Sequence, residues 1–395
     1  MTASTCFVEI GYNSLNKKGE ELCGDKVEVF QSEDRTIIVL ADGLGSGVKA
    51  NILATLTSKI SITMLKKGAD IEEVIETIAH TLPVCKVRNI AYSTFTIIEI
   101  DKNLRCKIFE SENPPFFFLR DQKILQPEKK EVVILDKTII LTDIQLQEED
   151  IIYICSDGVI HAGVGQTLNF GWEWKHVAKY VERKQDLNAG FLSRRLLEAC
   201  DELYDGLPGD DTTIVTLKIR QPVNVLLFTG PPLNPENDHE VIKKFMRTKG
   251  KKIVCGGTAA NIVARELGKE IETSLDYEDK SLPPTGKIEG VDLVTEGVLT
   301  ISRTIELIEA YRERKFKVED LGKDGASMLF DMLMSYGTHI DFWLGKAMNY
   351  AHQDPDFPVD LSIKMNVVKE LQRALESVGK VATIRYISEV RNENV

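Results

Sequence analysis

The feature that most constrains this chain is an apolar run that ends in a carboxylate and a glycine-rich turn. Residues 36–40 (Thr-Ile-Ile-Val-Leu) lead into Asp42-Gly43-Leu44-Gly45-Ser46-Gly47. β-branched residues that stop at Asp-Gly predict a buried strand followed by a tight turn. A carboxylate there costs several kcal/mol if it is desolvated without a partner. A cation is one such partner, and glycine lets the backbone approach closely enough for the Gly43 carbonyl to be a further oxygen ligand.

The same pattern recurs along the first half of the chain. Asp157-Gly158 follows the apolar run 151–155, Asp210-Asp211 precedes a third strand, and Asp25 precedes a strand-like segment. Four aspartate sites at strand ends predict one oxygen-rich pocket built from several strands. Ligation by oxygen alone suits Mg²⁺ or Mn²⁺ rather than zinc or copper.

Together these motifs resemble those of a known family. In chain order they are Cys23-Gly24-Asp25, Asp42-Gly43-Leu44-Gly45-Ser46-Gly47, Asn113-Pro114-Pro115, Ser156-Asp157-Gly158-Val159 and Asp210-Asp211-Thr212-Thr213. The set is similar to the metal-dependent serine/threonine protein phosphatases (the PPM class), and more narrowly to their bacterial sporulation stage II (SpoIIE-type) branch, over about residues 5–220. Asn113 departs from the commonest form of its motif, in which histidine is frequent.

The resemblance implies an enzyme that hydrolyses phosphoserine or phosphothreonine on a regulatory partner protein through a metal-activated water. Two Mn²⁺ or Mg²⁺ ions are implied, and no nucleophilic side chain is required. The implied ligands are Asp25, Asp42, Gly43, Asp157, Asp210 and Asp211. Asp42 would bridge both ions, Asp157 and Asp210 would complete one of them, and Asp25 would belong to the other. Asp42, Asp157 and Asp210 form the expected catalytic set, whereas Asp211 is the less certain member of its pair because the family's ligand stands first.

Lys17 and Lys18 lie in a polar loop seven or eight residues before Asp25. Related phosphatases often carry a basic residue in this region for the substrate phosphate, so the resemblance makes both lysines candidates for binding substrate. The alternative is a solvated pair of charges. Cys155 likewise has two interpretations, inert packing in a buried strand or redox sensitivity beside Asp157.

Composition narrows the class of protein. The chain has 395 residues, which predicts two or three domains, and carries 49 Lys and Arg against 61 Asp and Glu, a net charge of −12. This charge argues against nucleic acid or an anionic membrane as the main partner. Its seven cysteines include no C-x-x-C pair, which favours a reducing compartment. Without a signal-peptide pattern or an apolar run long enough to span a bilayer, we expect a cytoplasmic protein.

The order of predicted elements divides the chain near Arg220-Gln221-Pro222. Up to residue 220, strand-rich ends around central helices predict an α-β-β-α sandwich, two antiparallel sheets flanked by helices. In the first of these helices, Ile52, Leu56, Ile60 and Met64 recur every four residues, Leu53 widens the stripe, and together they predict the buried face. Residues 221–395 alternate strand and helix, which predicts a Rossmann-like α/β domain with helical additions. Within it we predict helices at 326–336, 340–352 and 363–378, and a final strand at 381–387.

One loop of this second domain is chemically suggestive. Gly256, Gly257 and Thr258 join a predicted strand to a helix, where N–H groups bind anions and glycines let a phosphate approach. We therefore expect a possible site for a small phosphorylated ligand or nucleotide, with a sensing or regulatory role. The alternative is an ordinary tight turn with Thr258 as the helix N-cap. Thr229-Gly230 follows the preceding strand and would face the same way if the sheet is parallel.

Two other classes of function stay open from the sequence. The first is a small-molecule phosphohydrolase or nucleotide-binding enzyme centred on residues 221–395. The second is a catalytically silent phosphatase-like adaptor, which the complete set of aspartates disfavours.

Overall fold

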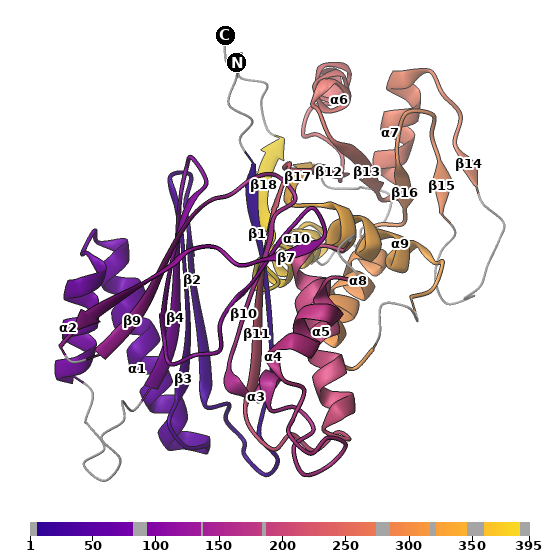
Figure 1. Ribbon diagram of the computed structural model, residues 1–395. Helices are drawn as coiled ribbons and strands as arrows, with labels where there is room; N and C mark the ends of the chain where they lie inside the picture. The colour runs from indigo at the N-terminus through magenta and orange to yellow at the C-terminus, as the bar shows by residue number, and fades with distance from the viewer. Residues whose placement is uncertain are drawn as a thin grey trace. The chain divides into compact units, whose positions relative to one another are not determined.

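The computed structural model describes residues 6–81, 93–135, 137–183, 187–273, 285–316, 321–345 and 359–387. The chain forms two compact units, Met1–Gln221 and Pro222–Val395, each of which mixes helices with sheets (Figure 1). The prediction of a mixed α/β chain is therefore confirmed. Within the described residues, no helix combines the length and the apolar character needed to cross a bilayer.

The first unit contains two antiparallel sheets. The six-stranded sheet has the order β2 (Asp25–Gln31), β3 (Arg35–Gly43), β4 (Ser93–Asp101), β5 (Arg105–Ser111), β9 (Lys137–Gln145) and β8 (Lys129–Ile134). The five-stranded sheet has the order β1 (Phe7–Leu15), β11 (Thr212–Arg220), β10 (Ile151–Cys155), β6 (Phe117–Arg120) and β7 (Lys123–Leu125). The helices are α1 (Gly47–Lys66), α2 (Ile71–Thr81), α3 (Asp157–Ile160), α4 (Trp174–Val181) and α5 (Ala189–Leu203).

Apolar side chains that point to alternate faces of the two sheets form three apolar layers. Residues such as Ile38, Ile98, Ile154 and Val215 face each other between the two sheets. The opposite face of the six-stranded sheet packs on α1 and α2. The opposite face of the five-stranded sheet packs on α4 and α5. Figure 1 shows these layers in the order helices, sheet, sheet, helices.

Helix α1 buries a face that is shifted from the predicted one. Leu53 is buried as expected, and Ile60 and Met64 pack against the same core. Ile52 and Leu56, however, are 52% and 42% exposed, and Ala50 and Ala54 are buried against the sheet in their place, so the prediction was wrong for these two residues. The reason is a close approach of backbones, because a Cβ on Gly43 would lie 2.0 Å from the carbonyl oxygen of Ala50. Only small side chains fit at such a contact, so the helix turns its alanines toward β3.

The second unit is built on one seven-stranded sheet. Its order is β14 (Glu272–Thr273), β15 (Gly286–Lys287), β16 (Leu293–Thr295), β13 (Lys251–Cys255), β12 (Asn224–Thr229), β17 (His339–Gly345) and β18 (Val381–Ile387). The last five strands in this order pair in parallel, and β14 and β15 form an antiparallel edge. Numbered along the chain, the parallel strands lie in the order 3-2-1-4-5.

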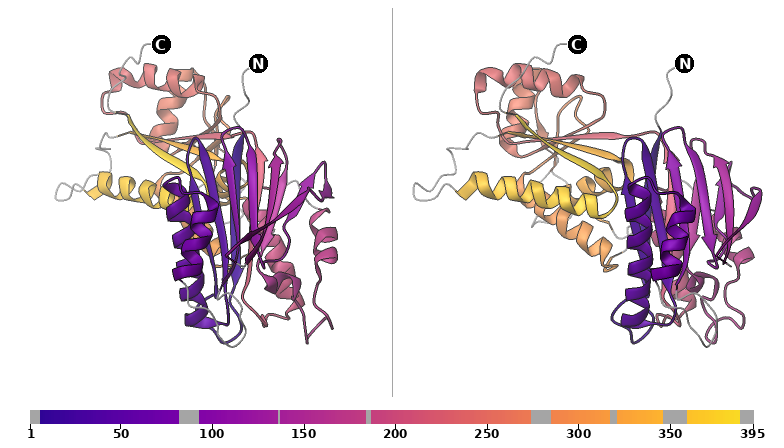
Figure 2. Two further views of the ribbon diagram at one scale, coloured as in Figure 1. Left: turned by 60° about the vertical axis from the view of Figure 1, so that its left-hand side comes forward. Right: turned by 90° about the vertical axis from the view of Figure 1, so that its left-hand side faces the viewer.

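Helices lie on both faces of this sheet (Figure 2). They are the short η1 (Pro235–Asn237), α6 (Asp238–Arg247), α7 (Gly257–Leu267), α8 (Val298–Arg312), α9 (Gly325–Asp331) with its continuation η3 (Met332–Tyr336), and α10 (Val359–Ser377). The helices α6 and α7 bury their apolar residues on one face, with Phe245 packed against Phe228 and Trp343. The helices α8, α9 and α10 pack with one another on the other face.

The helix predicted for residues 340–352 is wrong over its first part. Residues 339–345 form β17, which lies between β12 and β18, while residues 346–352 lie outside the described residues. The run Phe342-Trp343-Leu344 is buried on both faces of the sheet. A short continuous apolar run of this kind does not distinguish a buried strand from a buried helix by periodicity. Pairing with two neighbouring strands decides the conformation.

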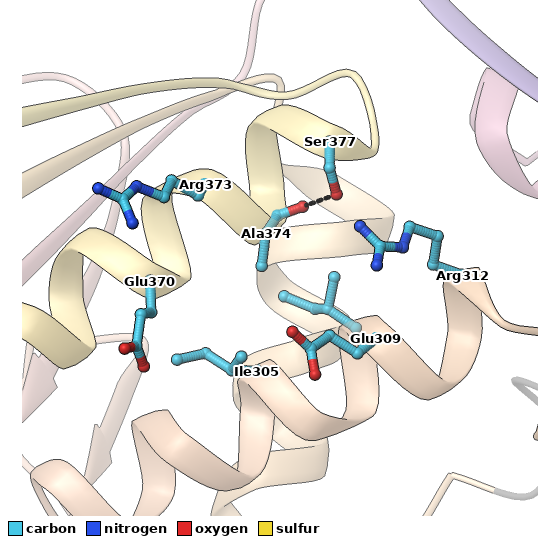
Figure 3. Close-up of a pocket in the computed structure, with 8 residues that line it drawn as sticks. Ile305, Glu309, Arg312, Glu370, Arg373, Ala374 and Ser377 are labelled. Atoms are coloured by element: carbon cyan, nitrogen blue, oxygen red, sulfur yellow. Dashed lines mark hydrogen bonds between the residues drawn. The ribbon is translucent and has the colours of Figure 1, made fainter.

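A shallow groove of about 210 Å³ lies between α8 and α10 (Figure 3). Glu309 and Arg312 of α8 and Glu370 and Arg373 of α10 surround it, with Ile305 and Ala374 at its floor. The four charged residues are exposed, so the groove is a solvated contact between two helices.

The packing of β1 on α5 gives a test of this fold. A Cβ on Gly11 would lie 2.3 Å from the Cα of Gly190, backbone against backbone. Gly11→Ala is therefore expected to destabilise the first unit by about 1–3 kcal/mol through overpacking. Urea denaturation with hydrogen exchange of the β1 and α5 amides measures the effect. Gly209→Ala is the matched control, because its methyl would meet only a ring carbon of Tyr204 at 3.5 Å. Equal stability of both variants would contradict the packing described.

Candidate functional site

Five aspartates come together where the ends of the two sheets of the first unit meet. Asp25 opens β2 and lies directly opposite Asp42, near the end of β3. Both strands belong to the six-stranded sheet. Asp157 begins α3 directly after β10, and Asp210-Asp211 immediately precede β11 in the five-stranded sheet. The sequence places these residues far apart, and the pairing of strands brings them together.

Asp25 is held by a polar chain that runs between the two sheets. Its side chain is buried, and its Oδ2 accepts a hydrogen bond of 2.7 Å from the Ser156 hydroxyl. The Thr213 N–H in turn donates to the Ser156 oxygen at 2.9 Å. Within the described part of the chain, Asp25 Oδ1 has no hydrogen-bond partner. Burial raises the pKa of Asp25 despite the hydrogen bond from Ser156, and the charges of Asp211 and Asp157 add to the increase.

Asp42 lies in the most strongly negative surroundings of the site. Burial raises the pKa of its carboxyl, and the nearby Asp25, Asp157 and Asp210 raise that pKa further. The backbone around it is fixed, since the Ser93 hydroxyl donates to the Asp42 carbonyl and the Gly43 N–H donates to the Gly24 carbonyl. The pKa of Asp157 is also raised, first by burial and then by Asp210.

The pair Asp210-Asp211 divides between two environments. Asp211 is buried, with Oδ1 accepting the Lys17 backbone N–H at 2.9 Å and Oδ2 unpartnered among the described residues. The side chain of Asp210 is 43% exposed, and its Oδ1 lies 3.5 Å from the Lys17 ammonium. Lys17 therefore reaches the carboxylates with both its backbone and its side chain. Lys18 is exposed, and its N–H donates to the Pro208 carbonyl.

The donor set fits a hard divalent cation. Two buried carboxylate oxygens, one on Asp25 and one on Asp211, lack a hydrogen bond within the described residues, and neighbouring carboxylates add to the raised pKa values of Asp25 and Asp42. A bound cation removes both costs, because it supplies the missing partner and offsets the repulsion. Among the residues that the structure describes, however, no three His, Cys, Asp or Glu side chains already form a ready-made metal cluster.

Some residues of the site were not predicted from the sequence. Ser156 and Thr213 lay within the quoted motifs, but their role in holding Asp25 follows only from the contact between the sheets. Glu20 accepts a hydrogen bond from Ser46 in the glycine-rich turn, and no sequence pattern pointed to it. Asn113 bonds to Thr94 and Thr96 of β4, which gives it a structural role in this sheet.

In the second unit, the predicted ligand loop lies at the carboxyl end of β13. Gly256 has a φ of +109° and is the N-cap of α7, so the interpretation of Thr258 as the N-cap is wrong. A Cβ on Gly256 would lie 3.7 Å from the Cα of Gly297, which precedes α8. A Cβ on Gly257 would meet nothing within 4 Å. The loop after β12 is at the same edge of the sheet, but its Gly230 lies against Gly345 rather than Gly256.

Comparison with known proteins concerns the first unit. The family described as stage II sporulation protein E matches residues 32–220. Stage II sporulation protein E of Bacillus subtilis (strain 168) is 24% identical over 217 residues, which are 54% of this chain and 26% of that protein. This chain thus spans about a quarter of the length of the curated relative it matches.

Two solved structures are similar to about half of this chain in three dimensions. One holds the PP2C phosphatase domain and a regulatory-domain fragment of SpoIIE from Bacillus subtilis, with 21% identity, a TM-score of 0.48 and coverage of 55% of this chain and 64% of that one. The other is the SiaA-PP2C domain of Pseudomonas aeruginosa, with 15% identity, a TM-score of 0.42 and coverage of 52% and 85%. The family match in sequence agrees with the motifs at strand ends, so the predicted resemblance is confirmed: residues 32–220 are similar to the SpoIIE-type PPM phosphatases.

Proposed function

We propose that the first unit is a Mn²⁺- or Mg²⁺-dependent phosphatase that hydrolyses phosphoserine or phosphothreonine on a regulatory partner protein. One observation carries this proposal: aspartates from two sheets gather at one point with buried oxygens of Asp25 and Asp211 unpartnered among the described residues. Such an arrangement is costly for folding alone and is typical of a site that binds cations. The family match to residues 32–220 supports the class of reaction.

The residues that would hold two ions are Asp25, Asp42, the Gly43 carbonyl, Asp157, Asp210 and, less certainly, Asp211. When bound, two such cations supply a hydroxide near neutral pH and a clamp for the phosphoryl oxygens. Asp42 would be the shared ligand, because it lies among the charges of Asp25, Asp157 and Asp210. Ser156 would keep Asp25 oriented by the hydrogen bond to its Oδ2.

Lys17 is the better of the two candidates for binding the substrate phosphate. Its ammonium lies 3.5 Å from Asp210, so it is already at the edge of the carboxylates. Lys18 is exposed and its backbone bonds to Pro208, which favours the solvated alternative for this residue. A silent adaptor stays the rival for the whole unit, and activity of the purified chain separates the two.

The first prediction concerns the proposed bridging ligand. Asp42→Asn is expected to lower Mn²⁺-dependent hydrolysis of a phosphoserine peptide by at least ~10²-fold, as for the loss of one group that stabilises charge in the transition state. The variant should fold, because the raised pKa shows that the Asp42 charge is unfavourable in the metal-free protein. Asp143→Asn is the matched control, since Asp143 is exposed and paired with Arg105. Full activity in a folded Asp42→Asn protein would exclude the assignment.

The second prediction is a pH dependence of cation binding. The pKa values of Asp25 and Asp42 are raised above the ordinary 3.8, so the metal-free fold takes up protons that the unfolded chain releases. The contribution of these groups to stability is therefore greatest in acid, and it falls as the pH rises above 3.8. Protons and cations compete for the same oxygens, and Mn²⁺ should bind more weakly at about pH 5.5 than at about pH 7.5. Calorimetric titration measures both affinities, with Asp143→Asn expected to match the wild type; equal affinity at the two pH values would mean that other groups bind the metal.

For the second unit, we propose a Rossmann-like domain that senses a phosphorylated ligand or nucleotide. Support comes from the parallel strand order 3-2-1-4-5 and from glycines at the carboxyl ends of β12, β13, β16 and β17. Ligands of doubly wound sheets bind outside this edge. The buried Thr229 hydroxyl at the end of β12 also has no hydrogen-bond partner among the described residues. This ligand site, not a second catalytic centre, is what the loop chemistry supports.

The third prediction tests that ligand loop. Gly257→Val should leave the fold unchanged, because an added Cβ meets nothing within 4 Å, and it should weaken nucleotide binding by filling the space before α7. Binding of ATP, GTP and inorganic phosphate to the full chain is measured by calorimetry, with Gly257→Ala as the milder step. If none of these binds, or if the valine variant binds equally well, residues 222–395 have a structural role instead.

A further inference from the structure

A cavity of about 210 Å³ lies behind the five-stranded sheet of the first unit, on the side away from the other sheet. It is enclosed by β10, α4 and α5, the elements that lie together on this side in Figure 1. Val181, Leu192 and Leu196 give it apolar walls, and all three are buried. Arg183 and Arg195 complete the lining, together with the hydroxyl-bearing Tyr153 and Tyr180.

Two hydroxyls on the strands beside this cavity lack a hydrogen-bond partner among the described residues. Tyr153 is 1% exposed, yet its hydroxyl makes no hydrogen bond within the part of the chain that the structure describes. Thr216 stands directly opposite Tyr153 on β11, and its buried hydroxyl also lacks a partner there. Residues directly opposite each other share a face of the sheet, so both hydroxyls lie on the side of α4 and α5. Buried polar groups are normally hydrogen-bonded, and the buried Thr216 hydroxyl is an exception beside the Tyr153 hydroxyl, which lines the cavity.

Both charged residues that line the cavity, among those described, are arginines. Within the same described residues, Arg183 and Arg195 form no ion pair with a carboxylate, and the Arg195 side chain interacts with the Tyr180 hydroxyl. The Tyr180 hydroxyl donates a hydrogen bond of 3.4 Å to the Arg195 carbonyl, so the backbone of Arg195 lies beside this tyrosine at the edge of the cavity. A guanidinium binds a carboxylate through two parallel hydrogen bonds. The lining therefore combines apolar side chains, the Tyr153 hydroxyl as a hydrogen-bond donor, and arginine side chains that can bind an anion.

We propose that this cavity is a binding site for a small carboxylate with an aromatic or branched apolar body. The carboxylate would bind Arg195 and Arg183, the body would pack on Leu192 and Leu196, and an oxygen of the ligand would accept from Tyr153. The volume is below the ~300–1,000 Å³ of sites for drug-sized ligands, so the ligand has about ten heavy atoms. It would touch the same strand, β10, whose end leads into Ser156 and Asp157.

The binding site is tested independently of the proposed phosphatase activity, with benzoate as the probe. Methyl NMR of the full chain follows Val181, Leu192 and Leu196 while benzoate, benzamide or inorganic phosphate is added up to about 20 mM. Benzoate is expected to shift these methyl resonances with a Kd of order 1 mM, as ligand efficiency allows for so few atoms. Benzamide lacks the charge and phosphate lacks the apolar body, so both should bind at least ~10-fold more weakly.

Two variants assign the contacts. Arg195→Gln should weaken benzoate binding by at least ~10-fold through loss of the bidentate pair. Tyr153→Phe should weaken it by about 3–10-fold with no loss of thermal stability, because the hydroxyl it removes has no partner among the described residues. Arg105→Gln, on the exposed side of the six-stranded sheet, is the control and should bind like the wild type.

Three results would overturn the proposal. The first is the absence of shifts at these methyls with benzoate, and the second is equal binding of benzoate and benzamide. The third is unchanged benzoate affinity in Arg195→Gln. A clear drop in melting temperature for Tyr153→Phe would show that the hydroxyl is already satisfied within the protein, which removes the main reason for a ligand there.

Discussion

The hydrogen bond from Ser156 to Asp25 joins the ends of the two sheets around a buried carboxylate. It links β10 to β2, and the Thr213 N–H extends the link to β11. Around it, burial and then the neighbouring carboxylates raise the pKa values of Asp25, Asp42 and Asp157. A cluster of this kind weakens the fold in the absence of a cation, and proteins accept such costs mainly at functional sites.

The glycines of the motifs are needed because backbone and carboxylates pack closely around the same site. A Cβ on Gly24 would lie 2.8 Å from Asp211 Oδ2, and one on Gly158 would lie 2.2 Å from the Asp211 carbonyl oxygen. Gly43 plays the corresponding part on the other sheet, where α1 approaches β3 through Ala50. Gly24, Gly43 and Gly158, each next to an aspartate, thus allow backbone or carboxylate to come closer than any side chain would permit. The recurring Asp-Gly pairs are a packing requirement as well as turns.

The site is also connected to the helices behind the five-stranded sheet. The Tyr204 hydroxyl, at the end of α5, donates to the Gly158 carbonyl at 2.7 Å. The strand β10 carries Tyr153 at the cavity and ends beside Ser156 and Asp157. Two of the three elements that enclose the cavity, β10 and α5, therefore touch the segment that carries Asp157. In the second unit, by contrast, the glycine loops lie at one edge of a parallel sheet whose helices cover both faces.

The sequence by itself determined that these aspartates lie at strand ends, because an apolar β-branched run that stops at Asp-Gly is a local signal that does not depend on tertiary contacts. It also determined the mixed α/β class and the change of pattern near residue 220. Tertiary structure decided what local signals cannot. Pairing with β12 and β18 made a strand of residues 339–345, since an apolar run is equally compatible with a buried helix. The close contact of Gly43 with Ala50 selected the buried face of α1. The partners of Asp25 and Asp211 were decided in the same way, because Ser156 and Lys17 are neighbours only after the two sheets have packed together.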